Sequence, residues 1–465
     1  MYFPEQTFLV AGISRSGVAA AEYLLAKGAK VYLYDDVTDE AVREATEKLV
    51  VKGARTVKKE ELASRSEECD VLVLSPGIPV DHPLPVSFKR MGKAVIGEAE
   101  LGARALRCPL VAVTGTNGKT TVVSLLEHIF RAAGKNAVAC GNIGKPLTAC
   151  LKELGEDGLA VDEVSSFQLE TLTSLRPHVA VVLNITEDHL NRHYTMENYI
   201  FLKQRILKNC AESEYAVLNY DDPIVRTFAE KTHANVVWFS LREQVEGAYC
   251  REGVLYWRGE RIMSADDLPL DGGHNVANAL AAICAAKQMG VRSETIASAI
   301  ASFRGVKHRI SKIGEVNGVT FIDDSKATNV DAAVKAIGSV KGESVLLVGG
   351  KDKGYAYEPL FEAVKRSGVV HVVIYGENAF RILNAAVKTD FTKVTLCRPF
   401  DMAVRVAYMT AKRGQNVLLS PASASFDSFK SYEERGERFA ELVNAFARES
   451  KSGSATEELF AGAAE

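Results

Sequence analysis

The residues best suited to chemistry lie in the segment V-A-V-T-G-T-N-G-K-T-T at 111–121, where an apolar run leads into a glycine-rich turn. Such a turn lets backbone N–H groups surround a phosphate, and a helix starting there adds the positive end of its dipole. Lys119 can reach the β- and γ-phosphates of a nucleotide, and the Thr120 hydroxyl can bind Mg²⁺. We therefore predict an ATP site whose phosphate loop consists of Gly115, Thr116, Asn117, Gly118, Lys119, Thr120 and Thr121.

This loop departs from the usual G-x-x-x-x-G-K-[ST] pattern, because Val113 stands where the first glycine is expected. A plain turn between a strand and a helix is the alternative interpretation. The Gly-Lys-Thr order between an apolar run and a helical pattern favours phosphate binding.

Two further apolar runs end in residues that suit a metal site. Glu163 lies at the end of the apolar run 159–164, one residue before its last position, and His189 follows the run 179–185. Ligands bind beyond the carboxyl ends of strands in an open parallel sheet, so both side chains are expected beside the phosphate loop. Carboxylate and hydroxyl oxygens suit Mg²⁺, whereas imidazole is softer than its usual ligands. Either residue alone could instead cap a helix.

A second candidate nucleotide loop, G-I-S-R-S-G at 12–17, lies between an apolar run and a helical pattern. Asp35 follows at about the distance of the acidic residue in a dinucleotide fingerprint. Ser14 replaces the second glycine of that fingerprint, which hinders close approach of a pyrophosphate. We predict a modified nucleotide-binding loop, with a plain tight turn as the alternative.

Four polar clusters in the last third of the chain, at 307–309, 323–329, 349–354 and 420–429, follow apolar runs or linkers. Each could be a capped loop, but together they indicate one ligand-binding face. Arg309 and Lys326 are the cations there that could offset phosphate charge.

The elements that must position these residues alternate between short apolar runs and helical patterns, which predicts parallel sheets built from βαβ units. Three α/β domains are expected, over 1–94, 95–304 and 305–465. Helices are expected at 18–27, 121–133, 275–289, 293–303 and 431–448. Strands are expected at 7–12, 30–34, 70–74, 109–113, 137–140, 159–164, 179–185, 215–219, 235–239, 318–322, 344–348, 369–375 and 416–419. The pattern at 247–263 predicts a β-hairpin as a small antiparallel part, and the tail 450–465 is expected to fray.

The composition limits the class of protein. The 465 residues contain 56 Lys plus Arg and 59 Asp plus Glu, which gives a net charge of −3. A protein that binds nucleic acid or membrane surfaces would show an excess of basic residues, so this balance argues against both partners. No apolar run approaches the ~18 residues of a membrane span, and the N-terminus lacks a signal-peptide pattern. Eight scattered cysteines without a C-x-x-C pair are typical of a reducing compartment. We expect a cytoplasmic protein.

Taken in order, the motifs resemble those of the Mur ligases, ATP-dependent amide-forming enzymes of peptidoglycan precursor synthesis. They are T-G-T-N-G-K-T-T, E-V-S-S-F-Q-L-E, N-I-T-E-D-H, G-G-H-N-V-A-N-A-L-A-A, H-R, D-D-S-K-A-T-N and S-P-A-S-A-S-F-D. The resemblance implies an N-terminal Rossmann-like domain for a UDP-sugar, a central P-loop ATPase-like domain and a C-terminal Rossmann-like domain for the incoming amino acid. The most similar members add D-glutamate to UDP-N-acetylmuramoyl-L-alanine through an acyl phosphate, and we expect a monomer.

The resemblance also implies roles for individual residues. Lys203 would be carbamylated, and this anion would help hold a second Mg²⁺. The metal set would be Thr120, Glu163, His189 and Lys203. Catalysis would involve Lys119, His189, Lys203 and Lys326. ATP would also contact Asn275, Asn278, Arg309 and Asp324. The UDP-sugar would contact Arg15, Ser16, Asp35, Ser75 and Asn142. D-Glutamate would contact Thr328, Lys353, Ser425 and Tyr432.

Other functions stay open on the sequence alone. Another Mur-type or folylpolyglutamate-type ligase would add a different acceptor, although the segment 420–429 favours D-glutamate. An NAD-dependent oxidoreductase built on the first loop would leave the second loop unexplained. A non-catalytic nucleotide-binding regulator would bind ATP without releasing phosphate.

Overall fold

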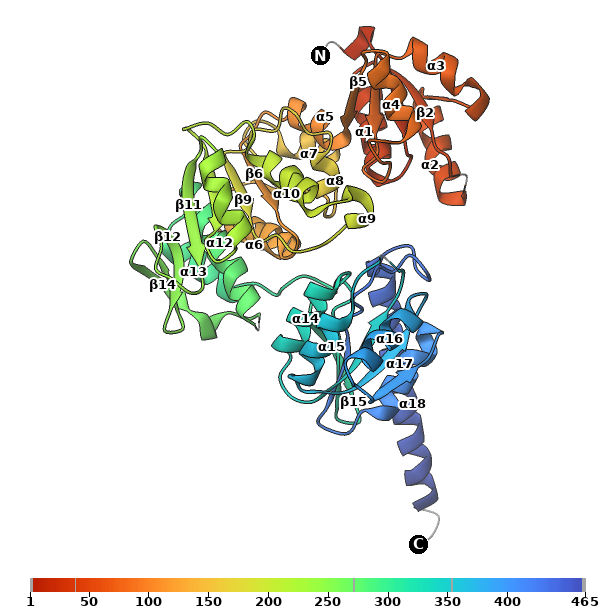
Figure 1. The fold of residues 1–465 in the computed structure, drawn as a ribbon, viewed down its shortest axis with the longest axis vertical. Helices are drawn as coiled ribbons and strands as arrows, with labels where there is room; N and C mark the ends of the chain where they lie inside the picture. The colour runs from red at the N-terminus through yellow and green to blue at the C-terminus, as the bar shows by residue number, and fades with distance from the viewer. Residues whose placement is uncertain (1–2, 38, 271, 353, 462–465) are drawn as a thin grey trace. The chain divides into compact units, whose positions relative to one another are not determined.

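The computed structural model describes residues 3–37, 39–270, 272–352 and 354–461. Its strands form three separate sheets, of five, nine and six strands (Figure 1). The chain divides into two compact units, Met1–Leu268 with Val276–Phe303 and Pro269–Asn275 with Arg304–Glu465. The first unit holds the first two sheets and the second unit holds the third. We describe each unit on its own.

The first sheet is entirely parallel, in the order β3-β2-β1-β4-β5. Its strands are β1 (Thr7–Ala11), β2 (Lys30–Tyr34), β3 (Arg55–Thr56), β4 (Val71–Leu74) and β5 (Ala94–Gly97). The accompanying helices are α1 (Arg15–Ala26), α2 (Glu40–Val51), α3 (Leu62–Glu68) and α4 (Pro83–Arg90). Alternate residues of β1 enter the two apolar clusters that pack on opposite faces of this sheet. The central strand β1 therefore delivers the 12–17 loop to the carboxyl edge.

The second sheet has the order β14-β13-β12-β11-β10-β9-β6-β8-β7. Its parallel strands are β6 (Leu110–Thr114), β7 (Ala137–Gly141), β8 (Leu159–Glu163), β9 (Val179–Val182), β10 (Tyr215–Asn219) and β11 (Asn235–Ser240). The chain then adds β12 (Gly247–Arg251) parallel to β11, followed by the antiparallel strands β13 (Val254–Trp257) and β14 (Glu260–Ser264). The predicted antiparallel part is confirmed, with three strands in place of a two-stranded hairpin.

The helices of this region lie between its parallel strands and after β14. They are α5 (Glu98–Ala105), α6 (Lys119–Ala132), α7 (Leu147–Leu154), α8 (Ser166–Leu169), α9 (Leu190–His193), α10 (Met196–Gln204), α11 (Pro223–Arg226), α12 (Gly273–Gln288) and α13 (Ser293–Ser302). The strand β6 lies between β8 and β9, so the loops after these three strands are neighbours at one edge. This edge carries the phosphate loop.

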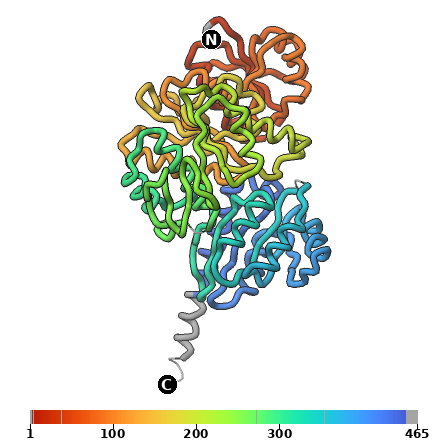
Figure 2. The backbone as a smooth tube through the Cα atoms, turned by 60° about the vertical axis from the view of Figure 1, so that its left-hand side comes forward, coloured from red at the N-terminus to blue at the C-terminus, as the bar shows by residue number. Residues whose placement is uncertain are grey.

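The third sheet has the order β15-β16-β20-β17-β18-β19. Its strands are β15 (Ser311–Val316), β16 (Val319–Asp323), β17 (Ser344–Gly349), β18 (Val369–Tyr375), β19 (Val394–Leu396) and β20 (Asn416–Leu419). Its helices are α14 (Val330–Ser339), α15 (Glu358–Lys365), α16 (Ala379–Lys388), α17 (Phe400–Thr410) and α18 (Tyr432–Ala461). All pairings are parallel except β15 with β16. In Figure 2 residues 304–450, coloured turquoise to blue, form one compact body.

Two expectations about the chain as a whole can now be assessed. The three-domain α/β architecture is confirmed. The helix α18 extends to Ala461, and fraying of the stretch 450–465 stays a prediction. That stretch contains Ala, Glu and Leu, whose high helix propensity favours continuation of the preceding helix. All eight cysteines are unpaired, as the sequence predicts. Within the described residues, none of the helices combines the length and apolar character needed to cross a bilayer.

Candidate functional site

The phosphate loop joins β6 to α6 and is shaped by two glycines. Gly118 caps α6 in a left-handed conformation with φ of 89°, and a β-carbon there would lie 2.4 Å from Oδ1 of Asn278. A β-carbon at Gly115 would lie 2.9 Å from Cβ of Leu183. Lys119 Nζ donates to the carbonyl oxygens of Gly115 and Thr116, at 2.9 and 2.8 Å. The loop is thus a tight cradle that leaves no room for larger side chains at its glycines.

Glu163 ends β8 directly beside the phosphate loop, because it pairs in register with Val113 of β6. Its Oε2 accepts a 2.7 Å hydrogen bond from the Thr120 hydroxyl, and its Oε1 accepts one of 2.8 Å from Asn142 Nδ2. Glu163 and Thr120 are both buried. The structure therefore brings together a carboxylate and a hydroxyl that the sequence predicts for the metal.

The loop after β9 is bonded to the phosphate loop at two points that the sequence reasoning missed. Asn184 accepts from the backbone N–H of Asn117 and donates to its carbonyl, at 2.9 and 3.0 Å. The Thr116 hydroxyl donates to the Thr186 carbonyl and accepts from the Thr186 N–H, each at 3.0 Å. The N-I-T order after a strand was the only signal for this contact. These bonds fix the position from which His189 projects.

His189 follows three residues later as the N-cap of α9, with a left-handed φ of 56°. Its N–H donates to Oδ1 of Asp188, and its ring packs edge-on against Phe167 at a centroid distance of 4.7 Å. A left-handed histidine costs about 1–3 kcal/mol of backbone strain, which the surrounding contacts must offset.

Lys203 of α10 is fully enclosed beneath the phosphate loop. Its Nζ donates 2.8 Å to the Gly115 carbonyl, and it lies 4.8 Å from the ring centroid of Tyr199. Burial, and then the nearby charge of Lys119, hold the pKa of Lys203 well below its ordinary value, although Asp188 and Glu163 oppose this shift. The side chain is therefore biased toward a neutral, nucleophilic amine.

The donor set fits a nucleotide with Mg²⁺. Thr120 and Glu163 offer hydroxyl and carboxylate oxygens, and the packing of Leu183 and Asn278 leaves no room for a β-carbon at Gly115 and Gly118 of the loop. Among the residues that the structure describes, no group of three or more His, Cys, Asp or Glu side chains could hold a metal ion.

A cavity of about 300 Å³ lies at the carboxyl end of β2, where Ile13 of the 12–17 loop lines one part of it. Asp35 anchors this loop, because its carboxylate accepts from the N–H groups of Ile13 and Val37 at 2.6 and 2.9 Å. The cavity is lined by Ile13, Leu33, Asp35, Val37, Arg43 and Thr46. A mostly apolar slot with a fixed carboxylate suits a flat polar ring such as a nucleobase.

Other residues predicted for the sugar nucleotide gather beside this loop. A β-carbon at Gly12 would lie 2.5 Å from Cβ of Ser75, so the two loops touch. The hydroxyls of Ser14 and Ser75 are 3.3 Å apart, and Arg15 Nη2 donates 3.0 Å to the Asn142 carbonyl. Ser16 is half-buried near the start of α1. The Arg15 contact therefore links the 12–17 loop of the first sheet to Asn142, which follows β7 and donates to Glu163.

In the second unit, the predicted residues collect at the ends of β16 and β20. Asp324 accepts from the Ile310 N–H at 3.3 Å and from the Ser420 hydroxyl at 2.8 Å. Burial raises the pKa of Asp324 to about 7, although the charge of Arg309 opposes the rise. The Nε of Arg309 is buried without a hydrogen-bond partner among the described residues. Lys326 Nζ donates 2.6 Å to the Tyr432 hydroxyl and lies 4.2 Å from its ring centroid.

Arg435 is a buried member of this cluster that the sequence reasoning missed. Its guanidinium donates to the Ser325 hydroxyl at 2.9 Å and to three carbonyls, of Ser325 at 2.8 Å, Ser423 at 3.0 Å and Ala424 at 3.3 Å. Arg435 therefore joins the loop after β16 to the loop that contains Ser425. In the sequence it is one of several arginines in the final helix, so no local pattern distinguishes it.

The remaining predicted residues are only partly tested. Asn275 and Asn278 are both buried on α12, three positions apart. Thr328 is half-buried after Lys326, and Ser425 is buried. Lys353 lies outside the described residues. The phosphate loop belongs to the first unit, while Arg309, Asp324 and Lys326 belong to the second.

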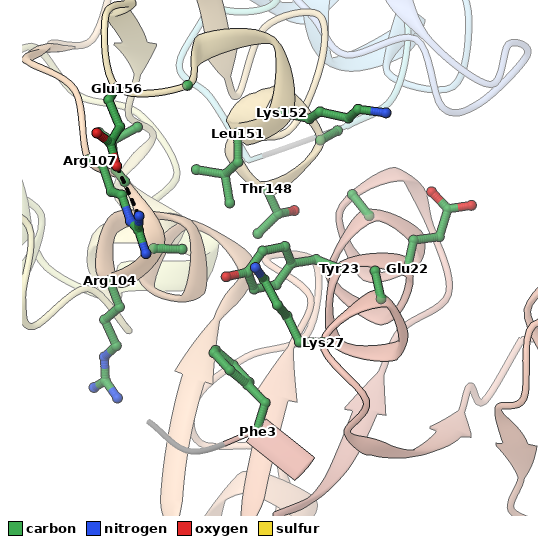
Figure 3. Close-up of a pocket in the computed structure, with 16 residues that line it drawn as sticks. Phe3, Glu22, Tyr23, Lys27, Arg104, Arg107, Thr148, Leu151, Lys152 and Glu156 are labelled. Carbon is green, nitrogen blue, oxygen red and sulfur yellow. Dashed lines mark hydrogen bonds and ion pairs between the residues drawn. The ribbon is translucent and has the colours of Figure 1, made fainter.

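A larger cavity, of about 1080 Å³, lies between α1 and the α5 and α7 helices (Figure 3). The side chains of Phe3, Tyr23, Lys27, Arg107 and Leu151 line it, and Arg107 pairs with Glu156 at 2.9 Å. None of the residues predicted for substrate or nucleotide lines this cavity. Cavity size alone therefore does not locate the candidate site.

Family models match three successive segments of the chain. They are the Mur ligase MurD-like N-terminal domain over residues 6–97, the Mur ligase middle domain over 113–286 and the Mur ligase glutamate ligase domain over 308–423. Two curated relatives named UDP-N-acetylmuramoylalanine--D-glutamate ligase align with 95% of this chain. The protein of Caldanaerobacter subterraneus subsp. tengcongensis is 40% identical, over 99% of its own length. That of Pelotomaculum thermopropionicum is 42% identical, over 98% of its length.

Solved structures give the same fold at lower identity. UDP-N-acetylmuramate-alanine ligase MurC from Thermotoga maritima is 18% identical with a TM-score of 0.62, over 95% of this chain and 100% of that one. MurF ligase from Thermotoga maritima in complex with ADP is 16% identical with a TM-score of 0.60, over 96% and 99%. Because family models match all three sheet regions and relatives about 40% identical align with nearly the whole sequence, this protein belongs to the Mur ligase family.

Proposed function

We propose that this protein is an ATP-dependent carbon–nitrogen ligase that adds D-glutamate to UDP-N-acetylmuramoyl-L-alanine during peptidoglycan precursor synthesis. One observation carries the proposal: a phosphate loop whose Thr120 is bonded to Glu163 on the neighbouring strand, in a chain about 40% identical to relatives named for this reaction. The NAD-dependent alternative loses its support, because it assigns no role to that loop. The proposed location is the cytoplasm.

The reaction needs activation because a carboxylate is a poor electrophile. The L-alanyl carboxylate oxygen attacks the γ-phosphorus of ATP, the bond to the β,γ-bridging oxygen breaks, and ADP leaves. The amine of D-glutamate then adds to the carbonyl carbon of the acyl phosphate. The resulting tetrahedral intermediate expels inorganic phosphate, and the amine proton passes to solvent or a nearby base. Such chemistry asks the protein mainly to position groups and offset charge.

Lys119 and the glycine cradle are the groups proposed to hold the β- and γ-phosphates. Thr120 and Glu163 would hold Mg²⁺, which supplies positive charge as negative charge moves onto ADP. His189 would stabilise the acyl phosphate, since it projects from the loop after β9 that is hydrogen-bonded to the phosphate loop. Asn275, Asn278 and Asp324 would contact the adenosine part of ATP.

Lys203 is proposed to be carbamylated and to hold a second Mg²⁺. Its neutral amine can attack CO₂, and loss of one proton leaves a carbamate anion. Its burial and the lowered pKa of its amine support this step, because an ammonium ion has no lone pair for the attack. The carbamate would replace this buried neutral amine by an anion near Glu163 and Lys119.

The UDP-sugar is proposed to lie across the first sheet's carboxyl edge. Its base would occupy the cavity at Asp35, while Ser75, Arg15, Ser16 and Asn142 would hold the diphosphate and sugar. The sugar's L-alanyl end would then point toward Asn142, whose side chain is bonded to Glu163.

The second unit is proposed to bring D-glutamate and additional positive charge. Lys326, Thr328, Ser425 and Tyr432 would hold its two carboxylates together with Lys353, and Arg309 would meet the transferred phosphate. These residues lie in a different unit from the phosphate loop. Domain limits of 1–94, 95–304 and 305–465 and a monomeric state complete the proposal.

Phosphate release is the test. The protein is incubated with ATP, Mg²⁺ and UDP-N-acetylmuramoyl-L-alanine, with D-glutamate, L-glutamate, L-alanine, L-lysine or meso-diaminopimelate added in separate reactions. We expect release and a matching gain in product mass with D-glutamate alone. Release with another acceptor would favour the alternative ligases, and ATP binding without release would favour a regulator. A Lys119→Ala variant with an unchanged rate would overturn the proposed site.

A further inference from the structure

Arg192 of α9 reaches from the second sheet's region to the first. Its Nε and Nη2 donate to the two carboxylate oxygens of Glu170, at 3.0 and 2.6 Å. Its Nη1 and Nη2 also donate to the carbonyl oxygens of Gly77 and Ile78, at 3.3 and 3.0 Å. One guanidinium therefore joins a carboxylate after α8 to backbone carbonyls of the loop after β4, in the bidentate geometry that only arginine provides.

This contact is shielded from water. The side chains of Arg192 and Glu170 are only 10% and 6% exposed. The Arg192 guanidinium carbon lies 4.8 Å from the Phe167 ring centroid, so an aromatic face covers one side. Exposed ion pairs contribute little, but an enclosed bidentate pair with further hydrogen bonds holds its geometry against competing water.

The carbonyls that Arg192 holds belong to a loop proposed to bind substrate. Ser75 packs on Gly12 of the nucleotide loop, and a β-carbon at Gly12 would also lie 3.2 Å from Cδ1 of Ile78. The Ile78 N–H donates 3.0 Å to the Ser75 carbonyl, which closes the turn. Movement of Gly77 and Ile78 would thus move Ser75 and the adjacent sugar-nucleotide site.

On its other side, Arg192 belongs to the segment that carries His189. Its backbone N–H donates 2.9 Å to the His189 carbonyl within the single turn of α9. Phe167 lies between the two side chains, since it contacts the Arg192 guanidinium on one hand and the His189 ring at 4.7 Å on the other. His193 adds a third tie, with Nδ1 3.5 Å from Oε1 of Glu170. The same α9 end also reaches the first region through Tyr194, whose hydroxyl donates to Asp81 at 2.5 Å.

We infer that Arg192 and Glu170 form a positioning pair that sets the distance between the sugar-nucleotide loop at 75–78 and His189. The inference rests on the proposed function, because it assumes that these two places meet the two ends of one reaction. Arg192 touches neither ATP nor the reacting carboxylate. It acts indirectly: it keeps the UDP-sugar bound at the first sheet in the position where its L-alanyl carboxylate is in line with the phosphate loop of the second sheet.

This role predicts a separation between binding and turnover. The nucleobase cavity at Asp35 does not include Arg192 or Glu170, so UDP should bind a variant as well as it binds wild type. The phosphate loop is bonded to Asn184 and Thr186 without Arg192, so the KM for ATP should also stay constant. Alignment of the carboxylate should be lost, and misplacement of about 1 Å can lower a rate by about 10²-fold.

The test compares Arg192→Met, Arg192→Lys, Glu170→Gln and the Arg192→Met/Glu170→Gln double variant. Arg104→Met is the matched control, because Arg104 pairs with the buried Glu100 at 2.7 Å on α5 without contacting the first sheet's loops. Each protein is assayed for kcat, KM for ATP and for UDP-N-acetylmuramoyl-L-alanine, UDP binding by calorimetry, and thermal unfolding. The wild type is assayed in parallel with D-glutamate.

We expect Arg192→Met to lower kcat about 10- to 100-fold while UDP binding and the KM for ATP change less than about threefold. Arg192→Lys should recover part of the loss, and the double variant should be no worse than Arg192→Met, because the pair acts as one unit. Arg104→Met should keep its kcat. An inactive wild type would refute the proposed function and not only this inference. With an active wild type, an unchanged kcat in Arg192→Met, equal losses in UDP binding and kcat, or additive single effects would overturn the inference.

Discussion

The hydroxyl of Thr120, in the first turn of the helix after the phosphate loop, donates a 2.7 Å hydrogen bond to Oε2 of Glu163 at the end of the adjacent strand. The two residues are 43 positions apart in sequence. Parallel pairing of β6 with β8 brings them together, and their burial keeps water from competing for the bond. A hydroxyl and a carboxylate held in this way are the two oxygen donors that we propose for magnesium.

Removal of the Thr120 hydroxyl should therefore weaken the response to magnesium. In a Thr120→Val variant, which keeps the volume, we expect activity to fall about 10²-fold at limiting Mg²⁺, as one positioned charge-stabilising group is lost. The Thr120→Ser variant keeps the hydroxyl and should stay within about tenfold of wild type. Titration of Mg²⁺ at saturating ATP measures this. Equal magnesium curves for the valine variant and wild type would contradict the assignment.

Lys203 should carry a carbamate when CO₂ is present. Because the pKa of Lys203 is lowered by burial, its amine stays neutral at pH values where an exposed lysine is protonated, and carbamate should increase as pH rises. After equilibration with ¹³C-bicarbonate, ¹³C NMR should show a carbamate resonance in wild type that is missing from Lys203→Met. A spectrum without that resonance at pH 8 would refute carbamylation.

Asp162, which precedes Glu163 on β8, should make stability depend on pH. Both its carboxylate oxygens are buried without a hydrogen-bond partner among the described residues, and burial raises its pKa from 3.8 to about 7. The folded state therefore holds a proton that the unfolded chain releases near pH 4, so stability falls as pH rises from about 4 to 7. The full shift corresponds to at most about 4 kcal/mol at 1.36 kcal/mol for each pKa unit.

An Asp162→Asn variant removes this titration. We expect it to unfold at a higher temperature than wild type at pH 8 and to lose that advantage near pH 5, as followed by circular dichroism. If the difference in Tm between the two proteins is the same at both pH values, the buried carboxyl of Asp162 is not the source of the dependence.

Arg435 should stabilise the second unit far more than an exposed arginine of the same helix. Arg435→Met would leave one hydroxyl and three carbonyls without their donor, and each buried group left unpaired costs about 1–3 kcal/mol. Arg438→Met is the control, because Arg438 forms a half-exposed pair with Asp401 that should contribute less than about 1 kcal/mol. Chemical denaturation followed by far-UV circular dichroism measures the free energy of unfolding of both variants. Equal losses would show that Arg435 does not tie the two loops together.

Much of the scaffold could be predicted because local patterns determine it. The strands 30–34, 215–219, 369–375 and 416–419 match the sequence predictions, since each is a short apolar run bounded by turn or charged residues. The edge strands β15 and β19 were not predicted, because their residues are mostly half-buried or exposed and lack a clear apolar run. Pairing with a neighbouring strand, more than composition, makes them strands.

The candidate site divides in the same way. Lys119, Thr120 and Glu163 lie in motifs with distinctive spacing, so their placement at one edge of a sheet could be predicted from the sequence alone. Arg192 and Arg435 do not lie in such motifs. The hydrogen-bond partners of Arg192 are 22 to 115 positions away in sequence, and those of Arg435 are 11 to 110 positions away. Only the folded chain shows that these two arginines are buried among carbonyl oxygens.

In the reaction that we propose, this site transfers a phosphoryl group to the substrate carboxylate before D-glutamate attacks. The most direct measurement uses UDP-N-acetylmuramoyl-L-alanine labelled with ¹⁸O in both oxygens of its alanyl carboxylate, together with unlabelled ATP, Mg²⁺ and D-glutamate. Because the attacking oxygen leaves with the phosphoryl group, mass spectrometry should find one ¹⁸O in each phosphate released and one in the new amide. Unlabelled phosphate accompanying amide formation would contradict the account.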